Sequence, residues 1–317
     1  MPNLTSRSLT SIPTSSKLSN ETLREIAAST LAKVEAGSYE AEDGAVYDLK
    51  ESANYMKEHT TFYPPNSDLG DWAAVTPSTT LAVTQILLAE CSTLEGTRNL
   101  HESLLSDPTE NKRIGVLNFA SAKNAGGGFI RGAQAQEESI ARSSSLYPSL
   151  INDEGAKFYR IHSKDPREGY YSHAMIYSPR VVFFRDDLGN WKSPIEVDII
   201  TCPAVNAGVV RQYLREIGSA DESKLDAAMK ERMARILYLF ERQGVRNLVL
   251  GSFGTGVFRN RVELVASIWT ELLIGEGARF EHSFDHVVFA ILGHQTFKTF
   301  ETIFGEASAV KVDAVTG

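Results

Sequence analysis

Three consecutive glycines, Gly126, Gly127 and Gly128, constrain the fold of this chain more than any other feature. Glycine loses more backbone freedom on folding than other residues, so a triplet is kept where the backbone turns tightly or approaches a ligand. The triplet follows an apolar run, residues 114–119, which predicts a strand. Seven residues separate it from Gln136, Glu137 and Glu138, where a helical segment begins. Two carboxylates beside a glycine loop indicate a candidate site for acid–base chemistry.

Helical and strand patterns alternate along the chain. Several predicted strands are apolar on successive residues, which is typical of strands buried on both faces. This alternation predicts an α/β fold, with a mixed or mostly parallel sheet covered by helices on both faces. Helices are predicted at residues 20–35 (N-cap Ser19), 49–58, 81–90 (N-cap Ser78 or Thr79), 139–150 (until Pro148), 225–240 and 262–274. Strands are predicted at residues 73–76, 114–119, 180–185, 195–202, 245–250 and 286–292.

One main domain, residues 71–305, is expected to follow a helical extension at residues 20–70. Residues 1–19 and 306–317 are expected to be tails. The first twenty residues carry nine Ser or Thr and only two basic residues, which favours a disordered tail over a mitochondrial transit peptide. No secretion signal is recognised, so an intracellular location, cytoplasmic or nuclear, is expected.

The net charge of −8, with no long basic run, does not favour direct binding to nucleic acid. A phosphate site would therefore rest on backbone N–H groups. No stretch approaches the roughly 20 apolar residues that span a membrane. Cys91 and Cys202 lack a neighbouring His and CxxC spacing, so we expect buried side chains in a reducing compartment.

A second glycine loop contains Gly254, Thr255 and Gly256. It lies between the predicted strand 245–250 and the helix 262–274. In that position free N–H groups and the helix dipole can bind a phosphate. A tight turn without a ligand explains the same residues equally well.

Several familiar sites do not fit the sequence. The second loop reads G-x-x-G-x-G rather than the dinucleotide pattern G-x-G-x-x-G, and Glu271, at the spacing of the ribose-binding acid, falls inside a predicted helix. No Gly-Lys-Ser/Thr or G-x-S-x-G is present. There is also no HExxH or CxxC, and His282 and His286 fall where their spacing does not bring the side chains together. A metal site is therefore not predicted.

Glu137 and Glu138 are expected to have different roles, because neighbours on a helix diverge by about 100°. The helix dipole lowers a carboxyl pKa slightly, whereas burial beneath a ligand and a neighbouring carboxylate raise it more strongly. Such a carboxyl would keep a proton near neutral pH. The alternative is a solvated acidic first turn without a catalytic role.

Together these residues resemble the poly(ADP-ribose) glycohydrolases, whose signature is GGG, six to eight residues, then QEE. The likeness is strongest to the microbial-type branch and covers roughly residues 20–305. It is carried by VLNFASAKNAGGGF at residues 116–129, GAQAQEE at 132–138 with SSSLY after it, ITCPAVN at 200–206 and GSFGTGVF at 251–258.

The resemblance implies a macrodomain-like three-layer α/β/α sandwich around a mixed sheet, with ADP-ribose bound across the strand ends. It implies cleavage of ribose–ribose O-glycosidic bonds in poly(ADP-ribose), expected from chain ends, without metal or cofactor. Glu138 would be the catalytic acid and then base, while an ionised Glu137 would position the ribose and help stabilise the cation. The implied substrate-binding residues are Gly126, Gly127, Gly128, Gln136, Asn118, Asn124, Gly254, Thr255, Gly256, Val257 and Phe258.

The expected partners are poly(ADP-ribose), ADP-ribose and ADP-ribosylated proteins, with the chain acting as a monomer in the DNA damage response. Two alternatives remain open. A macrodomain that only binds ADP-ribose could use the same loops, although it has no need of a proton donor. A hydrolase of mono-ADP-ribose esters could use the same carboxylates.

Overall fold

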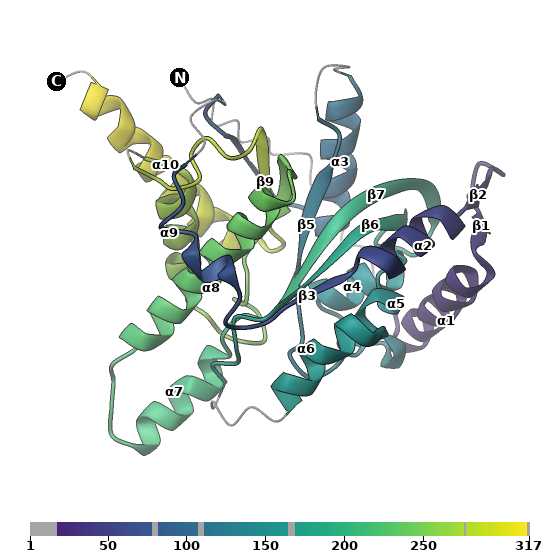
Figure 1. Ribbon diagram of the computed structural model, residues 1–317, viewed down its shortest axis with the longest axis horizontal. Coiled ribbons are helices and arrows are strands. Elements are labelled where there is room, and N and C mark those ends of the chain that lie inside the picture. Colours follow the sequence, from purple (N-terminus) through teal and green to yellow (C-terminus); the bar gives the residue numbers. More distant parts are fainter. Residues whose placement is uncertain (1–17, 78–81, 107–110, 164–168, 276, 316–317) are drawn as a thin grey trace.

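A mixed seven-stranded sheet forms the centre of the computed structural model, which describes residues 18–77, 82–106, 111–163, 169–275 and 277–315 (Figure 1). The strand order is β3-β6-β7-β5-β8-β9-β4. Neighbours from β7 to β4 are parallel, whereas β6 is antiparallel to both β7 and β3. The strands are β3 Thr61–Tyr63, β4 Gln85–Ala89, β5 Ile114–Phe119, β6 Met175–Arg185, β7 Trp191–Cys202, β8 Asn247–Leu250 and β9 His286–Ala290.

Helices cover both faces of this sheet (Figure 1). Successive strand residues point to opposite faces, so Leu117 joins one core cluster and its neighbour Val116 joins the other. The expected three-layer α/β/α sandwich is confirmed. The helical layer on the Leu117 side consists of α7 Ala207–Glu216, α8 Ser223–Arg242, α9 Val262–Leu273 and α10 His294–Val315. The layer on the Val116 side consists of α2 Lys50–His59, α3 Thr93–Leu105, α4 Gln136–Ser143, α5 Tyr147–Ile151 and α6 Asp153–Ser163.

The N-terminal segment packs on the edge of this sandwich. α1 Asn20–Ala36 begins as expected at Ser19, whose Oγ accepts a hydrogen bond from the Thr22 N–H at 3.1 Å. A small hairpin, β1 Ser38–Glu40 and β2 Val46–Asp48, follows, and β3 then adds an edge strand to the main sheet. The expected end of the main domain, residue 305, lies inside α10. The division into extension, domain and tails stays a prediction.

Most predicted elements are confirmed, with shifts of a few residues at their ends. The strand at 114–119 matches β5, and those at 180–185, 195–202, 245–250 and 286–292 overlap β6, β7, β8 and β9. The helices at 20–35, 49–58, 225–240 and 262–274 match α1, α2, α8 and α9. None of the helices within the described residues has the length and hydropathy to cross a bilayer.

Two predicted elements are wrong, and a third, the helix at 139–150, is divided into two. Residues 85–89 of the predicted helix 81–90 form the strand β4. The prediction failed because a short apolar run does not distinguish a buried strand from a helix. Residues 73–76, predicted as a strand, are an exposed turn after the 3₁₀ helix η1 Asp68–Asp71. The proposed caps Ser78 and Thr79 lie outside the described residues.

The predicted helix at 139–150 is two helices. α4 ends at Ser143, because Ser145 leaves the helix to bond β6: its N–H donates to the Val182 carbonyl at 3.0 Å, and its Oγ accepts from the Val182 N–H at 2.9 Å. Pro148 then lies in the first turn of α5, where its missing N–H is tolerated. The proline therefore begins a helix instead of ending one.

Candidate active site

The two glycine loops meet at one edge of the sheet. The first follows β5 and the second follows β8, and these strands are parallel neighbours, so their carboxyl ends lie side by side. The rings of Phe119 and Phe253, at the starts of the two loops, are 5.6 Å apart. The loop after β7, on the other side of β5, is tied to the second loop by Asn260, whose Nδ2 donates to the carbonyls of Val205 and Gly254. Three loops therefore converge on one place.

The first glycine loop passes directly against the glutamate pair. Gly126 and Gly127 have φ of +68° and +61°, a conformation that other residues adopt at a cost. A β-carbon added to Gly127 would overlap the carboxylate of Glu138 and lie 3.1 Å from Oε2 of Glu137. A β-carbon on Gly128 would lie 2.7 Å from Cβ of Ala133. The triplet is therefore required by both backbone conformation and close contact.

Glu138 faces the loop with one oxygen engaged. Its Oε1 accepts a hydrogen bond from the Gly128 N–H at 2.8 Å. Its Oε2 makes no hydrogen bond within the part of the chain that the structure describes. The side chain is half-buried. Glu138 can therefore exchange a proton with a bound molecule through Oε2 while the loop holds Oε1.

Glu137 is enclosed, with 3% of its surface exposed. Its Oε2 accepts from the Ser121 N–H at 2.6 Å, and its Oε1 accepts from Nδ2 of Asn118 at 3.4 Å. Burial, opposed by the Ser121 N–H and reinforced by the charge of Glu138, raises the pKa of Glu137 to about 8. Glu137 is therefore neutral at pH 7 in this environment, unlike the ionised Glu137 that the resemblance implied.

Asn118 and Gln136 connect the pair to β5. Asn118 is fully buried, and its Nδ2 also donates to Oγ1 of Thr201 at 3.2 Å. Its Oδ1 is buried without a hydrogen-bond partner among the described residues. Gln136 accepts from the Phe119 N–H at 2.8 Å and donates to the Leu117 carbonyl at 2.7 Å. Both amides bond protein groups that position α4, and their expected contact with substrate stays a prediction.

Asn124, the other expected ribose contact, has an exposed side chain in the first loop. Its backbone carbonyl accepts from the Gly127 N–H at 2.9 Å and so closes the glycine turn. Of the expected amide contacts, it is the one placed at the surface of the site.

The second glycine loop is closed at Gly254 and open at Gly256. Gly254 has φ +74°, and a β-carbon there would overlap Cβ of Ala204. Nothing lies within 4 Å of a β-carbon placed on Gly256, so its backbone faces open space. Thr255 Oγ1 donates to the Ser252 carbonyl at 2.9 Å. Val257 is 82% exposed and Phe258 is half-buried, so the open backbone at Gly256 lies beside an apolar rim.

Two features of this edge were missed in the sequence. The Tyr159 hydroxyl is buried with no hydrogen-bond partner among the described residues, and burial and then the charge of Glu137 raise its pKa. Glu90 and His294 follow β4 and β9, with Oε2 and Nδ1 3.0 Å apart. Because residues 81–90 were predicted as a helix, Glu90 was not recognised as a residue at the end of a strand.

Among the described residues, no three or more His, Cys, Asp or Glu side chains are grouped so that they could hold a metal ion. The site combines the Glu138 side chain with its unbonded Oε2, the neutral carboxyl of Glu137 and a second glycine loop whose backbone is open at Gly256. Such an arrangement can bind an anion and exchange a proton beside it.

Comparison with known proteins agrees with this geometry. The family model for the catalytic domain of microbial-type PARG matches residues 27–186, half of the chain. No curated protein matches. The solved poly(ADP-ribose) glycohydrolase of Thermomonospora curvata is 34% identical, with a TM-score of 0.80 over 90% of this chain and 100% of that one.

The similar solved structures include complexes with ligands. The Thermomonospora curvata protein bound to the inhibitor ADP-HPD is 33% identical, with a TM-score of 0.76 over 89% of this chain and 99% of that one. The Deinococcus radiodurans poly(ADP-ribose) glycohydrolase in complex with ADP-ribose is 34% identical, with a TM-score of 0.69 over 80% of this chain and 97% of that one. Identity at this level over nearly the whole fold confirms the macrodomain-like architecture. The chain belongs to the microbial-type PARG family.

Proposed function

We propose that this protein hydrolyses ribose–ribose O-glycosidic bonds in poly(ADP-ribose) and releases ADP-ribose from chain ends. The observation that carries the proposal is the placement of Glu138 against the glycine loop. Gly128 holds its Oε1, and its Oε2 is left for a substrate. A protein that only binds ADP-ribose has no need of such a carboxylate.

The two loops would bind the diphosphate of the terminal ADP-ribose unit. The backbone of residues 126–128 would line one side of the diphosphate, although the N–H groups of Gly127 and Gly128 already bond Asn124 and Glu138. The N–H groups of Gly254 and Gly256 would donate to it from the other side. Gly256 has the open space that such an approach needs. Phe258 would pack against a ribose, and the net charge of −8 is consistent with recognition by backbone donors instead of a lysine cluster.

The reaction would use Glu138 twice. Departure of the ribose 2′-oxygen leaves an oxocarbenium-like sugar, and Oε2 of Glu138 would give that oxygen its proton. The resulting carboxylate would take a proton from water, whose oxygen bonds to the anomeric carbon, and Glu138 would return to its starting state. Neutral Glu137 would donate a hydrogen bond to a ribose hydroxyl and fix the scissile bond beside Glu138.

The test is release of free ADP-ribose from purified poly(ADP-ribose), compared with release from a protein that carries single ADP-ribose esters. Faster release from the polymer supports the proposal. Binding of the polymer without release would show a non-catalytic ADP-ribose-binding protein. Release from the single esters alone would show a mono-ADP-ribosyl hydrolase.

A further inference from the structure

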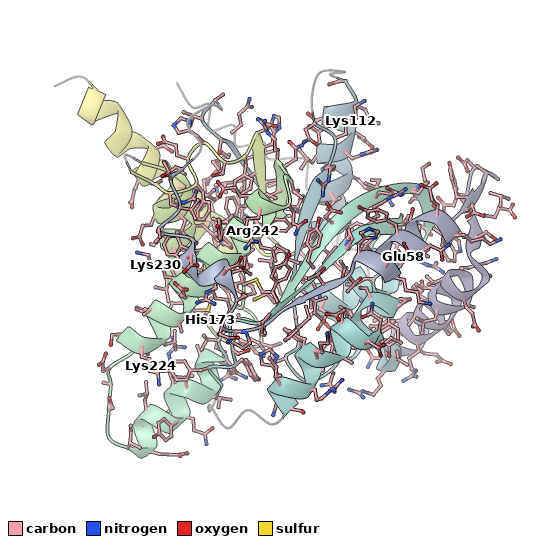
Figure 2. All side chains as sticks on the ribbon, viewed as in Figure 1. Glu58, Lys112, His173, Lys224, Lys230 and Arg242 are labelled. Carbon is pink, nitrogen blue, oxygen red and sulfur yellow. The ribbon has the colours of Figure 1, made fainter. Side chains whose placement is uncertain are left out.

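A cleft of about 660 Å³ lies next to the candidate active site, between the chain before β6 and helices α7 and α8. Its walls include Tyr170, Tyr171 and His173 from the first segment, Tyr213 from α7 and Lys224 from α8. Figure 2 shows His173 and Lys224 on the same side of the molecule, towards its lower left. None of these residues takes part in the chemistry proposed for Glu138.

The cleft is continuous with the loops of the active site. The ring of Tyr171 is 5.9 Å from that of Phe258 in the second glycine loop. Arg232, buried at the base of the cleft, donates to the Pro203 carbonyl at 3.0 Å and to the Tyr170 carbonyl at 2.9 Å. Pro203 directly follows β7, the strand beside β5. A polymer that leaves the active site at this edge can therefore reach the cleft.

The side chains of the cleft suit a nucleotide. Nζ of Lys224 lies 4.7 Å from the centre of the Tyr170 ring and supplies a cation for a pyrophosphate. Tyr213 is 36% exposed, and its ring contacts no other aromatic ring among the described residues. A base can stack on such a ring. The carboxylate of Asp221, also in the lining, can accept a hydrogen bond from the amino group of adenine.

The backbone of this wall is strained. Tyr171 has φ +53°, a left-handed conformation that is unfavourable for a non-glycine residue. Hydrogen bonds on both sides hold it: the Asn206 N–H donates to the Gly169 carbonyl at 2.7 Å, and the Ser172 N–H donates to Nε2 of His162 at 3.2 Å. Strain that the surroundings maintain is concentrated at binding and catalytic sites.

We propose that this cleft binds the adenosine of the next polymer unit, the one whose ribose oxygen leaves when the terminal ADP-ribose is cut. The inference rests on the proposed function and adds a second nucleotide subsite to it. A cleft of similar size, about 620 Å³, lies at the other edge of the sheet. It is lined by ion-paired residues such as Arg113 and Asp198 near the start of β5, away from the glycine loops. Tyr55 in that cleft offers a matched control.

Binding to the Glu138→Gln protein separates the subsite from turnover. Calorimetry would measure the Kd for single ADP-ribose and for a linear ADP-ribose oligomer, with and without Tyr213→Ala. We expect Tyr213→Ala to weaken oligomer binding about tenfold, because one stacked base is lost, and to leave single ADP-ribose within twofold. Lys224→Glu should act in the same direction, and Tyr55→Ala should change neither Kd.

An oligomer Kd that Tyr213→Ala and Lys224→Glu leave unchanged would overturn the subsite. Equal weakening of single ADP-ribose and oligomer would also overturn it, because the cleft would then serve the terminal unit or the fold. Release of ADP-ribose by the wild-type protein would still support the proposed function in both cases. Failure of the Glu138→Gln protein to bind single ADP-ribose would refute the proposed function and the subsite together.

Discussion

Replacing Glu137 with glutamine should change how the stability of the protein depends on pH. Burial raises the pKa of Glu137 from an ordinary 4.5 to about 8. Between these values the folded protein keeps a proton that the unfolded chain has lost, so the free energy of unfolding falls as pH rises. The slope from this group is at most about 1.4 kcal/mol per pH unit, or about 3 kcal/mol between pH 5 and pH 7. The loss of unfolding free energy that this group causes is complete only above pH 8.

Glutamine matches the neutral carboxyl in shape and does not titrate. Its Oε1 can accept from the Ser121 N–H, as Oε2 of Glu137 does now. Its amino group would face Asn118, whose Oδ1 is buried without a partner among the described residues and can accept after rotation of the amide. The substitution therefore leaves no cavity. Rotation of the Asn118 amide breaks its hydrogen bond to Thr201, a cost that does not depend on pH, and every other titrating residue is common to both proteins.

Urea unfolding followed by circular dichroism at pH 5, 6, 7 and 8 tests this reasoning. We expect wild-type protein to lose about 3 kcal/mol relative to Glu137→Gln between pH 5 and pH 7. Glu35→Gln, on the exposed face of α1, should follow the wild-type curve. Parallel curves for wild-type protein and Glu137→Gln would refute a buried, neutral Glu137.

Three further predictions concern the loop, its support and the expected independence of turnover from metal ions. Gly127→Ala places a β-carbon on the Glu138 carboxylate at φ +61°, so kcat/KM for ADP-ribose release should fall at least about 100-fold, and wild-type turnover would contradict this. Asn118→Ala removes the donor to Glu137 and Thr201, so the free energy of unfolding in urea should fall by about 1–3 kcal/mol. The pKa of Glu137 should also rise further, and an unchanged pH dependence of the unfolding free energy would count against this prediction. Dialysis against EDTA should leave turnover within twofold, and a loss reversed by added Zn²⁺ or Mg²⁺ would exclude a carboxylate-only mechanism.

The strands that lead into the site were predictable from the sequence, because their patterns are unambiguous. Residues 114–119 form an apolar run followed by glycines, and β5 has those same bounds. Residues 81–90 were misassigned because an apolar run of this length fits a buried strand and a helix alike. What decides between them is the pairing of β4 with β9, a contact between distant parts of the chain.

The glutamate pair was also predictable, but the environment of each carboxyl was not. Which of Glu137 and Glu138 points inward depends on the rotation of α4. That rotation is fixed by Gln136, which bonds the backbone of β5 at Leu117 and Phe119. The cleft beside Tyr170 and Tyr213 could not be predicted from the sequence either, because its walls come from segments that meet only in the folded protein.

The central claim is that Glu138 is the acid and base of the reaction, and Glu138→Gln tests it most directly. Glutamine keeps an oxygen for the Gly128 N–H but cannot exchange a proton. Release of ADP-ribose from poly(ADP-ribose) by this variant should fall by about 10²–10⁴-fold, while its Kd for ADP-ribose stays within threefold of wild type. Turnover at the wild-type rate would contradict the account.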